Sequence, residues 1–172
     1  MIFDIRESLD TDAIEAYLDR VMERNAALRV GITTGVFDMT HAYHTLYLKR
    51  CKGRCDLLVV GVDADHLVAA VKGPDRPIMN EQLRSLGVDS LKPVDFTFIL
   101  NDLEDLSLAA RLFRRAHALL FKNQAFVGAG APEKVVGLEH GAELVIVPDL
   151  EVLTSTTEII ASVQRRVSTD AG

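Results

Sequence analysis

The sequence is poor in several features that mark whole classes of protein. Only two of its 172 residues are cysteines, Cys51 and Cys55, and without a second pair they are not expected to form a structural zinc site. No apolar run approaches the roughly 20 residues that a membrane-spanning helix needs. The stretch 1–10 is too acidic and has too few apolar residues for a signal peptide. We therefore expect a cytoplasmic protein with reduced, partly buried cysteines and no membrane partner.

Positive charge is also in short supply. The formal net charge is −6 at pH 7, which argues against a nucleic-acid partner, because a general nucleic-acid binder carries a basic face. A local basic pocket is still compatible with this charge. The content of 48% hydrophobic and 26% charged residues is ordinary for a globular protein, and a chain of this length is expected to form one domain with a sizeable core.

What the sequence does have is a regular alternation of short apolar runs with helix-forming segments. This alternation predicts a doubly wound, Rossmann-like α/β fold, in which five parallel strands carry helices on both faces. An amphipathic helix over 10–26 precedes the first strand and packs either on the core or on another subunit. We divide the chain into an N-terminal helical extension (1–27), a main domain (28–167) and a tail (168–172). The expected strands cover 28–33, 56–62, 94–100, 118–121 and 143–147, and the expected helices cover 41–53, 64–70, 80–91, 104–116, 132–140 and 155–167.

The stretch from Gly35 to His44 is the strongest candidate for a functional site. An apolar strand ends before it, the chain turns at Gly35, and a helix begins near His41. The unpaired N–H groups and the partial positive charge of a helix N-terminus then point at whatever lies above the end of the strand. His41 and His44 lie three residues apart, on one side of the first helical turn. This arrangement suits a polyphosphate, although surface or capping roles are the common alternative for such histidines.

Other polar groups follow the remaining strands. Lys72 and Arg76 lie in a loop after the second strand, Lys122 follows the fourth strand, and the sequence Ser-Thr-Thr at 155–157 follows the fifth. The carboxyl ends of parallel strands meet at one edge of the sheet, where ligands of such folds bind, so we expect these groups to lie near one another. A solvated loop for the basic pair and a helix cap for 155–157 are the alternatives.

Several short patterns occur in order along the chain: Gly-Val-Phe-Asp at 35–38 with His-x-x-His at 41–44, Lys-Gly-x-x-Arg-Pro at 72–77, Arg84, and Ser-Thr-Thr at 155–157. Together they resemble the signature of the cytidylyltransferase-like nucleotidyltransferases. The likeness is greatest to the adenylyltransferase domain of ADP-heptose synthase, with glycerol-3-phosphate cytidylyltransferase next. It covers roughly residues 28–165, and ordered patterns are more specific than any single one.

The resemblance implies an enzyme that transfers a nucleoside monophosphate from ATP or CTP to a phosphorylated sugar or polyol and releases pyrophosphate. It implies Mg²⁺ as the companion of the nucleoside triphosphate, with no protein residue assigned as a metal ligand. It also implies a homodimer, which the apolar stripe of the helix over 10–26 favours independently. The catalytic residues that it implies are His41, His44, Lys72 and Arg84. The nucleotide-binding residues are Gly35, Val36, Phe37, Asp38, Tyr43, Lys122, Ser155, Thr156 and Thr157, and the substrate-binding residues are Asp63 and Arg76.

Two positions depart from the family pattern. Tyr43 stands where the family has a glycine between its histidines, so its ring either fills part of the nucleotide space or points aside. The sequence Lys-Asn-Gln-Ala at 122–125 replaces the usual Lys-Gly-Gly-Asp, which leaves the base and the acceptor open. An active nucleotidyltransferase is our first hypothesis, and an impaired member that binds nucleotide or a protein partner without turnover is the second. A dinucleotide-dependent oxidoreductase is disfavoured, because the Gly-Ala-Gly at 128–130 lacks the third glycine of that fingerprint.

Overall fold

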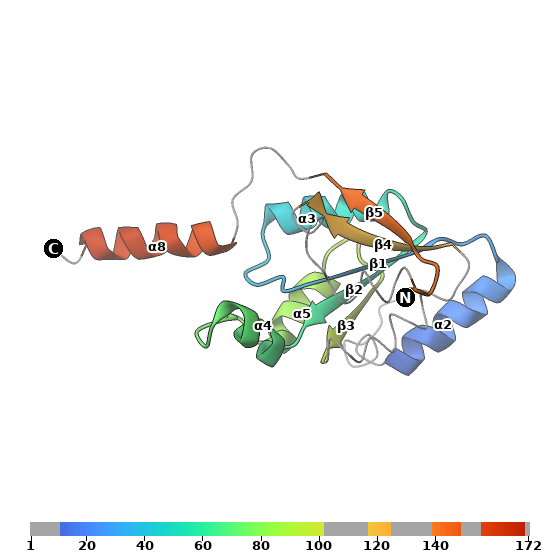
Figure 1. Cartoon of the computed structure of the whole chain (residues 1–172), viewed down its shortest axis with the longest axis horizontal. Helices are drawn as coiled ribbons and strands as arrows, with labels where there is room; N and C mark the ends of the chain where they lie inside the picture. The colour runs from blue at the N-terminus through green and yellow to red at the C-terminus, as the bar shows by residue number, and fades with distance from the viewer. Residues whose placement is uncertain (1–10, 102–116, 125–138, 149–155, 171–172) are drawn as a thin grey trace.

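The structure, a computed structural model, describes residues 11–101, 117–124, 139–148 and 156–170 (Figure 1). Its centre is a five-stranded sheet in which every pairing is parallel and the strand order is β3-β2-β1-β4-β5. The parallel, Rossmann-like α/β fold expected from the sequence is therefore confirmed. The strands are β1 (Val30–Gly35), β2 (Leu57–Asp63), β3 (Phe96–Leu100), β4 (Ala118–Asn123) and β5 (Glu143–Val147).

The strand order places β1 at the centre of the sheet. Val30 of β1 is in register with Leu57 of β2 on one side and with Ala118 of β4 on the other. The chain adds β2 and β3 on the first side and then returns to add β4 and β5 on the second, so the order reverses between β1 and β4. In open parallel sheets such a reversal opens a crevice at the carboxyl ends of the two strands, and ligands bind there.

Alternate residues of the strands fill two cores, one on each face of the sheet. Val30 and Ile32 belong to one buried cluster, and Phe121 and Cys55 belong to the other. Gly31 lies between Val30 and Ile32 in the sequence, and it faces the cluster that contains Phe121 and Cys55. A Cβ atom at Gly31 would be 2.5 Å from the ring of Phe121 and 2.6 Å from the Sγ atom of Cys55. The missing side chain therefore lets these two residues close over β1.

Helix α2 (Thr11–Arg24) covers the first face of the sheet. Ile14 and Leu18 are buried in that cluster, and the rings of Tyr17 and Phe96 pack with their centroids 5.1 Å apart. The sequence left open whether this helix packs on the core or on another subunit, and the structure shows that it packs on the core. The apolar stripe of this helix is therefore used within the chain and does not supply an argument for a subunit interface.

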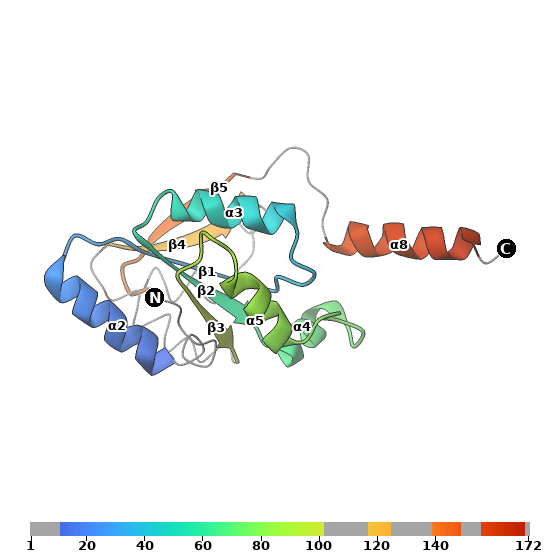
Figure 2. The ribbon, with the colours of Figure 1, turned by 180° about the vertical axis from the view of Figure 1, so that it is seen from behind.

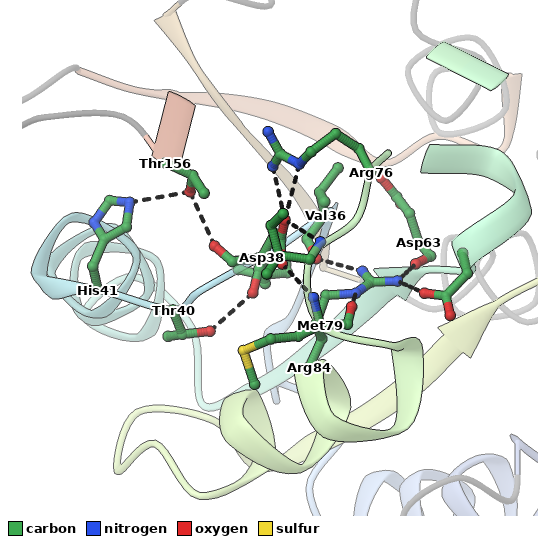
Figure 3. Close-up of polar contacts among 12 residues, drawn as sticks. Val36, Asp38, Thr40, His41, Asp63, Arg76, Met79, Arg84 and Thr156 are labelled. Carbon is green, nitrogen blue, oxygen red and sulfur yellow. Dashed lines mark hydrogen bonds and ion pairs between the residues drawn. The ribbon is translucent and has the colours of Figure 1, made fainter. Parts of the chain in front are cut away.

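Three further helices surround the carboxyl edge of the sheet. Helix α3 (Ala42–Lys52) covers the second face, with Leu48 and Cys51 buried. Helices α4 (Asp65–Lys72) and α5 (Glu81–Asp89) both follow β2 in the chain. They position the loop between them next to the turn that joins β1 to α3 (Figure 3).

Helix α5 is rotated relative to the expectation from its sequence. The apolar spacing predicts that Leu83, Leu86 and Val88 face inward. Val88 is buried, but the prediction is wrong for the leucines, because Leu83 is 50% and Leu86 is 38% exposed. Arg84 and Ser85 occupy the inward positions instead. The inward-facing guanidinium of Arg84 bonds to the carbonyl oxygens of Met79, Val36 and Asp63.

Helix α8 (Thr156–Asp170) extends away from the sheet, as both views of the molecule show (Figures 1 and 2). Its Val163 is 53% exposed. Only the first turn of this helix approaches the β1–α3 turn in the close-up, through Thr156 (Figure 3). The N-terminus of α8, and not its length, is therefore the part that contributes to the edge of the sheet.

The bounds of the strands agree with the sequence-based expectations to within two residues. The helices expected over 104–116 and 132–140 lie outside the described residues, apart from the last residues of the second, and so does Ser155. Among the helices that the structure describes, none is long and apolar enough to cross a membrane.

The close packing at Gly31 yields a test of the fold. Replacing Gly31 with alanine forces a methyl group against Phe121 and Cys55, and we expect the free energy of unfolding to fall by about 1–3 kcal/mol. Urea denaturation followed by circular dichroism measures this change. Gly53→Ala is the matched control, because a Cβ there meets only backbone oxygens at 3.5 Å and 3.6 Å, which is ordinary contact. Equal stability of the two variants would contradict the packing described here.

Candidate active site

The turn between β1 and α3 has an unusual backbone. Phe37 and Met39 both have left-handed φ angles, of 50° and 48°, which cost non-glycine residues about 1–3 kcal/mol each unless their surroundings hold them. The Phe37 side chain is 5% exposed, and a Cβ on Gly35 would be 3.3 Å from its ring. The Thr40 hydroxyl donates to the Phe37 carbonyl oxygen at 3.0 Å. The chain thus stores strain where the sequence predicts the nucleotide loop.

Two histidines cap the helix that follows this turn. His41 is the N-cap of α3, and its Nδ1 accepts a hydrogen bond from the backbone N–H of Tyr43 at 3.3 Å. The Nδ1 of His44 accepts from the backbone N–H of His41, also at 3.3 Å. Because Nδ1 is the acceptor in both neutral rings, both carry their proton on Nε2. The two ring centroids are 4.2 Å apart, so the pair presents two adjacent N–H donors.

Both histidines favour the neutral form. Burial lowers the pKa of His44 to about 4, and the positive charges of His41 and Lys72 act in the same direction. Burial also lowers the pKa of His41. In the unliganded protein at neutral pH the pair therefore donates hydrogen bonds without carrying charge. A bound polyanion would favour protonation, because an adjacent opposite charge stabilises the charged form of a group.

The carboxylate of Asp38 joins the β1–α3 turn to the loop between α4 and α5. It is 2% exposed and accepts hydrogen bonds from Nε and Nη2 of Arg76, at 3.1 Å and 2.8 Å, and from the backbone N–H groups of Ile78 (2.9 Å) and Met79 (3.0 Å) (Figure 3). Burial alone would raise the pKa of Asp38, but these donors outweigh it and keep the pKa below its usual value. Asp38 and Arg76, expected at the nucleotide and the acceptor, bind each other in this structure.

Arg84 ties three segments together. Its side chain is fully buried, and its guanidinium donates to the carbonyl oxygens of Met79 (2.9 Å), Val36 (2.5 Å) and Asp63 (2.7 Å) (Figure 3). A further bond joins Nη2 to a carboxylate oxygen of Asp65 at 2.7 Å. These contacts occupy most of the five N–H donors of a guanidinium. Arg84 therefore braces the β1–α3 turn against the end of β2 and the start of α5.

Lys72 is a basic residue whose positive charge acts on the histidine pair. It is the last residue of α4 and is exposed to solvent. Partial burial of its ammonium group lowers its pKa, with Arg76 acting in the same direction and Asp63 opposing it. Its charge also lowers the pKa of His44, which shows that the two groups lie within electrostatic reach of each other.

Lys122 lies at the carboxyl end of β4 but on the other face of the sheet from α3. Alternation along the strands places it on the side of Leu120 and Ile32, which belong to the cluster beneath α2. Its side chain is 5% exposed, and its Nζ donates to the Thr34 hydroxyl at 2.9 Å. Thr34 did not stand out in the sequence. The feature that could have pointed to Thr34 is its hydroxyl group near the end of an otherwise apolar strand.

Thr156 brings the last helix to the site. Its hydroxyl donates to the carbonyl oxygen of Asp38 at 3.0 Å, and it lies 3.4 Å from Nε2 of His41 (Figure 3). Since Nε2 carries the proton, His41 is the donor in the second contact. Thr157 is exposed, and Ser155 lies outside the described residues. Of the two threonines of the expected Ser-Thr-Thr group, Thr156 contacts the histidine pair in the described part of the chain.

Tyr43 lies beside both histidines. Its ring centroid is 6.4 Å from that of His41 and 6.4 Å from that of His44, and the ring is half-buried. Its backbone N–H is the donor that orients the His41 ring. The replacement of the family glycine therefore adds an aromatic side wall to the pair and does not disturb the cap of the helix.

The described residues contain no cluster of three or more His, Cys, Asp or Glu side chains that would hold a metal ion. The carboxylate of Asp38 is committed to Arg76 and two backbone N–H groups, and that of Asp65 contacts Arg84. Asp38 and Asp65 are thus committed to contacts within the chain, and Mg²⁺ stays a prediction.

Fold and site together define a class of protein. A parallel α/β sheet whose central strand leads through a strained turn into a histidine-capped helix is a Rossmann-like nucleotide-binding domain. The family model described as cytidylyltransferase-like matches residues 32–162, and the chain belongs to this family.

Individual relatives agree with this assignment. The chain is 36% identical over 157 residues to the bifunctional protein HldE of Hyphomonas neptunium, which covers 89% of this chain and 30% of the relative. It is 34% identical over 144 residues to HldE of Caulobacter vibrioides, with 83% of this chain and 29% of the relative covered. The chain thus spans about a third of the length of these relatives. A crystal structure of a lipopolysaccharide core biosynthesis protein from Thermoplasma volcanium is similar with a TM-score of 0.57 and 27% identity, covering 74% of this chain and all of that one.

The neutral histidine pair predicts how stability depends on pH. The pKa of His44 is lower in the folded protein than in the unfolded chain, so its contribution is present above about pH 6.5 and is lost as the pH falls toward 4. We expect unfolding free energy to drop by about 2 kcal/mol between pH 7 and pH 4.5 through this group. His44→Gln keeps a neutral acceptor for the N-cap and should flatten that slope in urea denaturation. His66→Gln, on the exposed side of α4, is the control, and an unchanged slope in His44→Gln would refute the assignment.

Proposed function

We propose that the protein is a nucleotidyltransferase that transfers a nucleoside monophosphate from ATP or CTP to a phosphorylated sugar or polyol and releases pyrophosphate. The family assignment supports nucleotidyl transfer in general. The observation that carries the proposal to this site is the pair of Nε2–H donors at the N-terminus of α3, at the carboxyl end of β1. Donors of this kind match the non-bridging oxygens of a triphosphate.

The proposed reaction is a single in-line displacement. A phosphate oxygen of the acceptor attacks the α-phosphorus of the nucleoside triphosphate, and the bond from that phosphorus to the bridging oxygen breaks. The bridging oxygen leaves with the electron pair as part of pyrophosphate. No covalent intermediate on the protein is required, so catalysis consists of positioning and of donors aimed at the developing negative charge.

In this proposal His41 and His44 donate their Nε2–H groups to phosphate oxygens, and Lys72 supplies positive charge beside them. A bound triphosphate either replaces the Thr156 hydroxyl as the acceptor of the His41 Nε2–H group or shares that donor with it. The backbone of Gly35 to Phe37 lines the nucleotide pocket. Mg²⁺ bound to the nucleotide adds positive charge at the leaving phosphates when it is present.

We propose different roles for three residues that the resemblance assigns to ligands. Asp38, Arg76 and Arg84 act as positioning residues, because their polar groups are committed to one another and to the backbone of the strained turn. They hold His41 and His44 in place and do not contact phosphate themselves. Lys122 lies at the carboxyl end of β4, on the face of the sheet opposite to α3, and we assign it to the acceptor or to the far part of the nucleotide.

Partners and location stay predictions. We expect a homodimer from the resemblance to dimeric enzymes alone, since α2 uses its apolar stripe on the core of its own chain. We also expect a cytoplasmic protein without a nucleic-acid or membrane partner. The alternative function is nucleotide binding without turnover, and Tyr43 is the observation that favours it, because its ring stands beside both catalytic histidines.

Turnover distinguishes the two functions. The protein, assayed with each nucleoside triphosphate, Mg²⁺ and a panel of sugar and polyol phosphates, should release pyrophosphate in a coupled assay. His44→Ala should lower kcat by about a hundredfold or more, the scale of losing one donor to the transition state. His66→Ala should leave kcat unchanged. Nucleotide binding in calorimetry without pyrophosphate from any acceptor would support the alternative function.

The positioning role of Arg84 has its own signature. Lysine keeps the positive charge but lacks the planar fork, so Arg84→Lys cannot satisfy the Val36, Met79 and Asp63 carbonyls together. We expect Arg84→Lys to lower the free energy of unfolding by about 2–4 kcal/mol. We expect kcat to fall as well, because the turn that positions the histidines is no longer braced. Arg54→Lys, at an exposed site, is the control. A loss of activity with unchanged stability would instead indicate direct contact between Arg84 and phosphate.

A further inference from the structure

Helix α4 carries Lys72 at an end that packs on little else. Of the side chains of this helix, that of Val68 is buried, and it lies in the N-terminal half. The last turn is exposed, with Val71 at 80%. Lys72 is the last residue and lies about 10 Å along the helix axis from Asp65, the first residue. The position of Lys72 therefore depends on how the start of α4 is held.

The start of α4 has no cap of its own. Its N-cap residue is Ala64, whose methyl group cannot accept a hydrogen bond. The first N–H groups of a helix need acceptors from outside that helix. Glu81, the first residue of α5, supplies one of them, because its Oε2 accepts from the backbone N–H of Asp65 at 2.8 Å. Glu81 thus caps a helix to which it does not belong.

Helix α5 supports both sides of the candidate site. Its Arg84 bonds to the Val36 carbonyl oxygen in the turn that precedes the histidines. Arg84 also bonds to the carboxylate of Asp65 at 2.7 Å, through a side chain that is 40% exposed. The bond from Glu81 ends on the backbone of α4 instead, so it fixes the helix itself. The histidine turn and the helix that carries Lys72 therefore share one support.

The two groups that α5 supports act on each other. Burial and the positive charges of His41 and Lys72 lower the pKa of His44, and the carboxylate of Asp38 opposes them. A Coulomb interaction weakens as the distance between the charges grows. The pKa of His44 therefore reports how closely Lys72 is held to the histidine pair.

We infer that Glu81 is a positioning residue, which anchors the start of α4 and thereby holds Lys72 beside the histidine pair. The use of Lys72 in catalysis rests on the proposed nucleotidyl transfer, whereas the anchor itself is present without turnover. Displacement of a reacting or charge-stabilising group by about 1 Å can cost about a hundredfold in rate. The alternative role of Glu81 is to complement the partial positive charge at the N-terminus of α5, its own helix.

Two substitutions separate reach from charge. Glu81→Asp keeps the negative charge at the start of α5, but its side chain is one methylene too short for the N–H of Asp65. Glu81→Gln removes the charge and keeps an acceptor oxygen at the same reach. We expect kcat to fall about tenfold in Glu81→Asp and to stay within about twofold in Glu81→Gln. The reverse order would assign Glu81 to the dipole of α5 and overturn the inference.

A Lys72→Ala background shows whether the anchor acts through Lys72. In that background Glu81→Asp should no longer lower kcat, because there is no ammonium group left to misplace. An equal fold loss in both backgrounds would overturn the inference and leave Glu81 a role in stability alone. Asn25→Ala is the control for a lost backbone acceptor, since it frees the N–H of Ala27 before β1 and should leave kcat unchanged.

A histidine titration by NMR tests the anchor in the unliganded chain. Protonated His44 and Lys72 repel each other, so a released α4 should carry Lys72 away and raise the pKa of His44 in Glu81→Asp, whose formal charge equals that of the wild type. Lys72→Ala should raise this pKa at least as far, and Glu81→Asp should then add nothing. An unchanged pKa of His44 in either single variant would overturn the inference.

The outcomes also separate this inference from the function on which it rests. A wild-type protein that releases no pyrophosphate overturns nucleotidyl transfer, and the titration of His44 then decides the role of Glu81. Pyrophosphate release at the full rate by Glu81→Asp leaves nucleotidyl transfer standing and overturns the role of Glu81. Equal losses of kcat in Glu81→Asp and Glu81→Gln, in chains that melt at the wild-type temperature, overturn it as well.

Discussion

The geometry of the site depends on one buried carboxylate. Asp38 is held in its ionised form by Arg76 and by the N–H groups of Ile78 and Met79, and in return it fixes a turn that contains two left-handed residues. Together with the bonds from Thr40 to the Phe37 carbonyl and from Arg84 to the Val36 carbonyl, this anchor offsets the backbone strain at Phe37 and Met39. The N-cap of α3 follows directly after this turn, so the placement of the histidine pair begins with Asp38.

The histidine pair carries no charge in the unliganded protein at neutral pH. Backbone N–H groups occupy both Nδ1 atoms and burial disfavours protonation, so two Nε2–H donors are oriented before any ligand arrives. Oriented donors need no reorganisation during the reaction. In the proposed reaction a triphosphate would bring the negative charge that these donors lack, and the positive charge of Lys72 already acts on His44.

Much of this architecture was accessible from the sequence because its signals are local. The alternation of apolar runs with helical segments predicted the parallel sheet, and strand bounds agree to within two residues. The two histidines were identified from their spacing, from their place at the start of a helix that follows an apolar strand, and from the family resemblance. The partners of Arg84 were not, since they come from carbonyl groups 5, 21 and 48 residues away that no side-chain pattern records. The same is true of Asp38 and Arg76, which the sequence presents as two ligand-binding residues and the structure joins as a pair.

The sequence by itself determined the class of fold, the family and the helix N-terminus at which phosphate chemistry is expected, because periodicity and short ordered motifs are properties of neighbouring residues. Only the tertiary structure decided which polar groups bond to one another within the chain and on which face of the sheet each one lies. Asn123 and Lys122 are adjacent in sequence, yet alternation in a strand turns them to opposite faces, toward α3 and toward Thr34. The two side chains also differ in their partners. The buried Oδ1 of Asn123 accepts no hydrogen bond within the described part of the chain, whereas Nζ of Lys122 donates to the Thr34 hydroxyl.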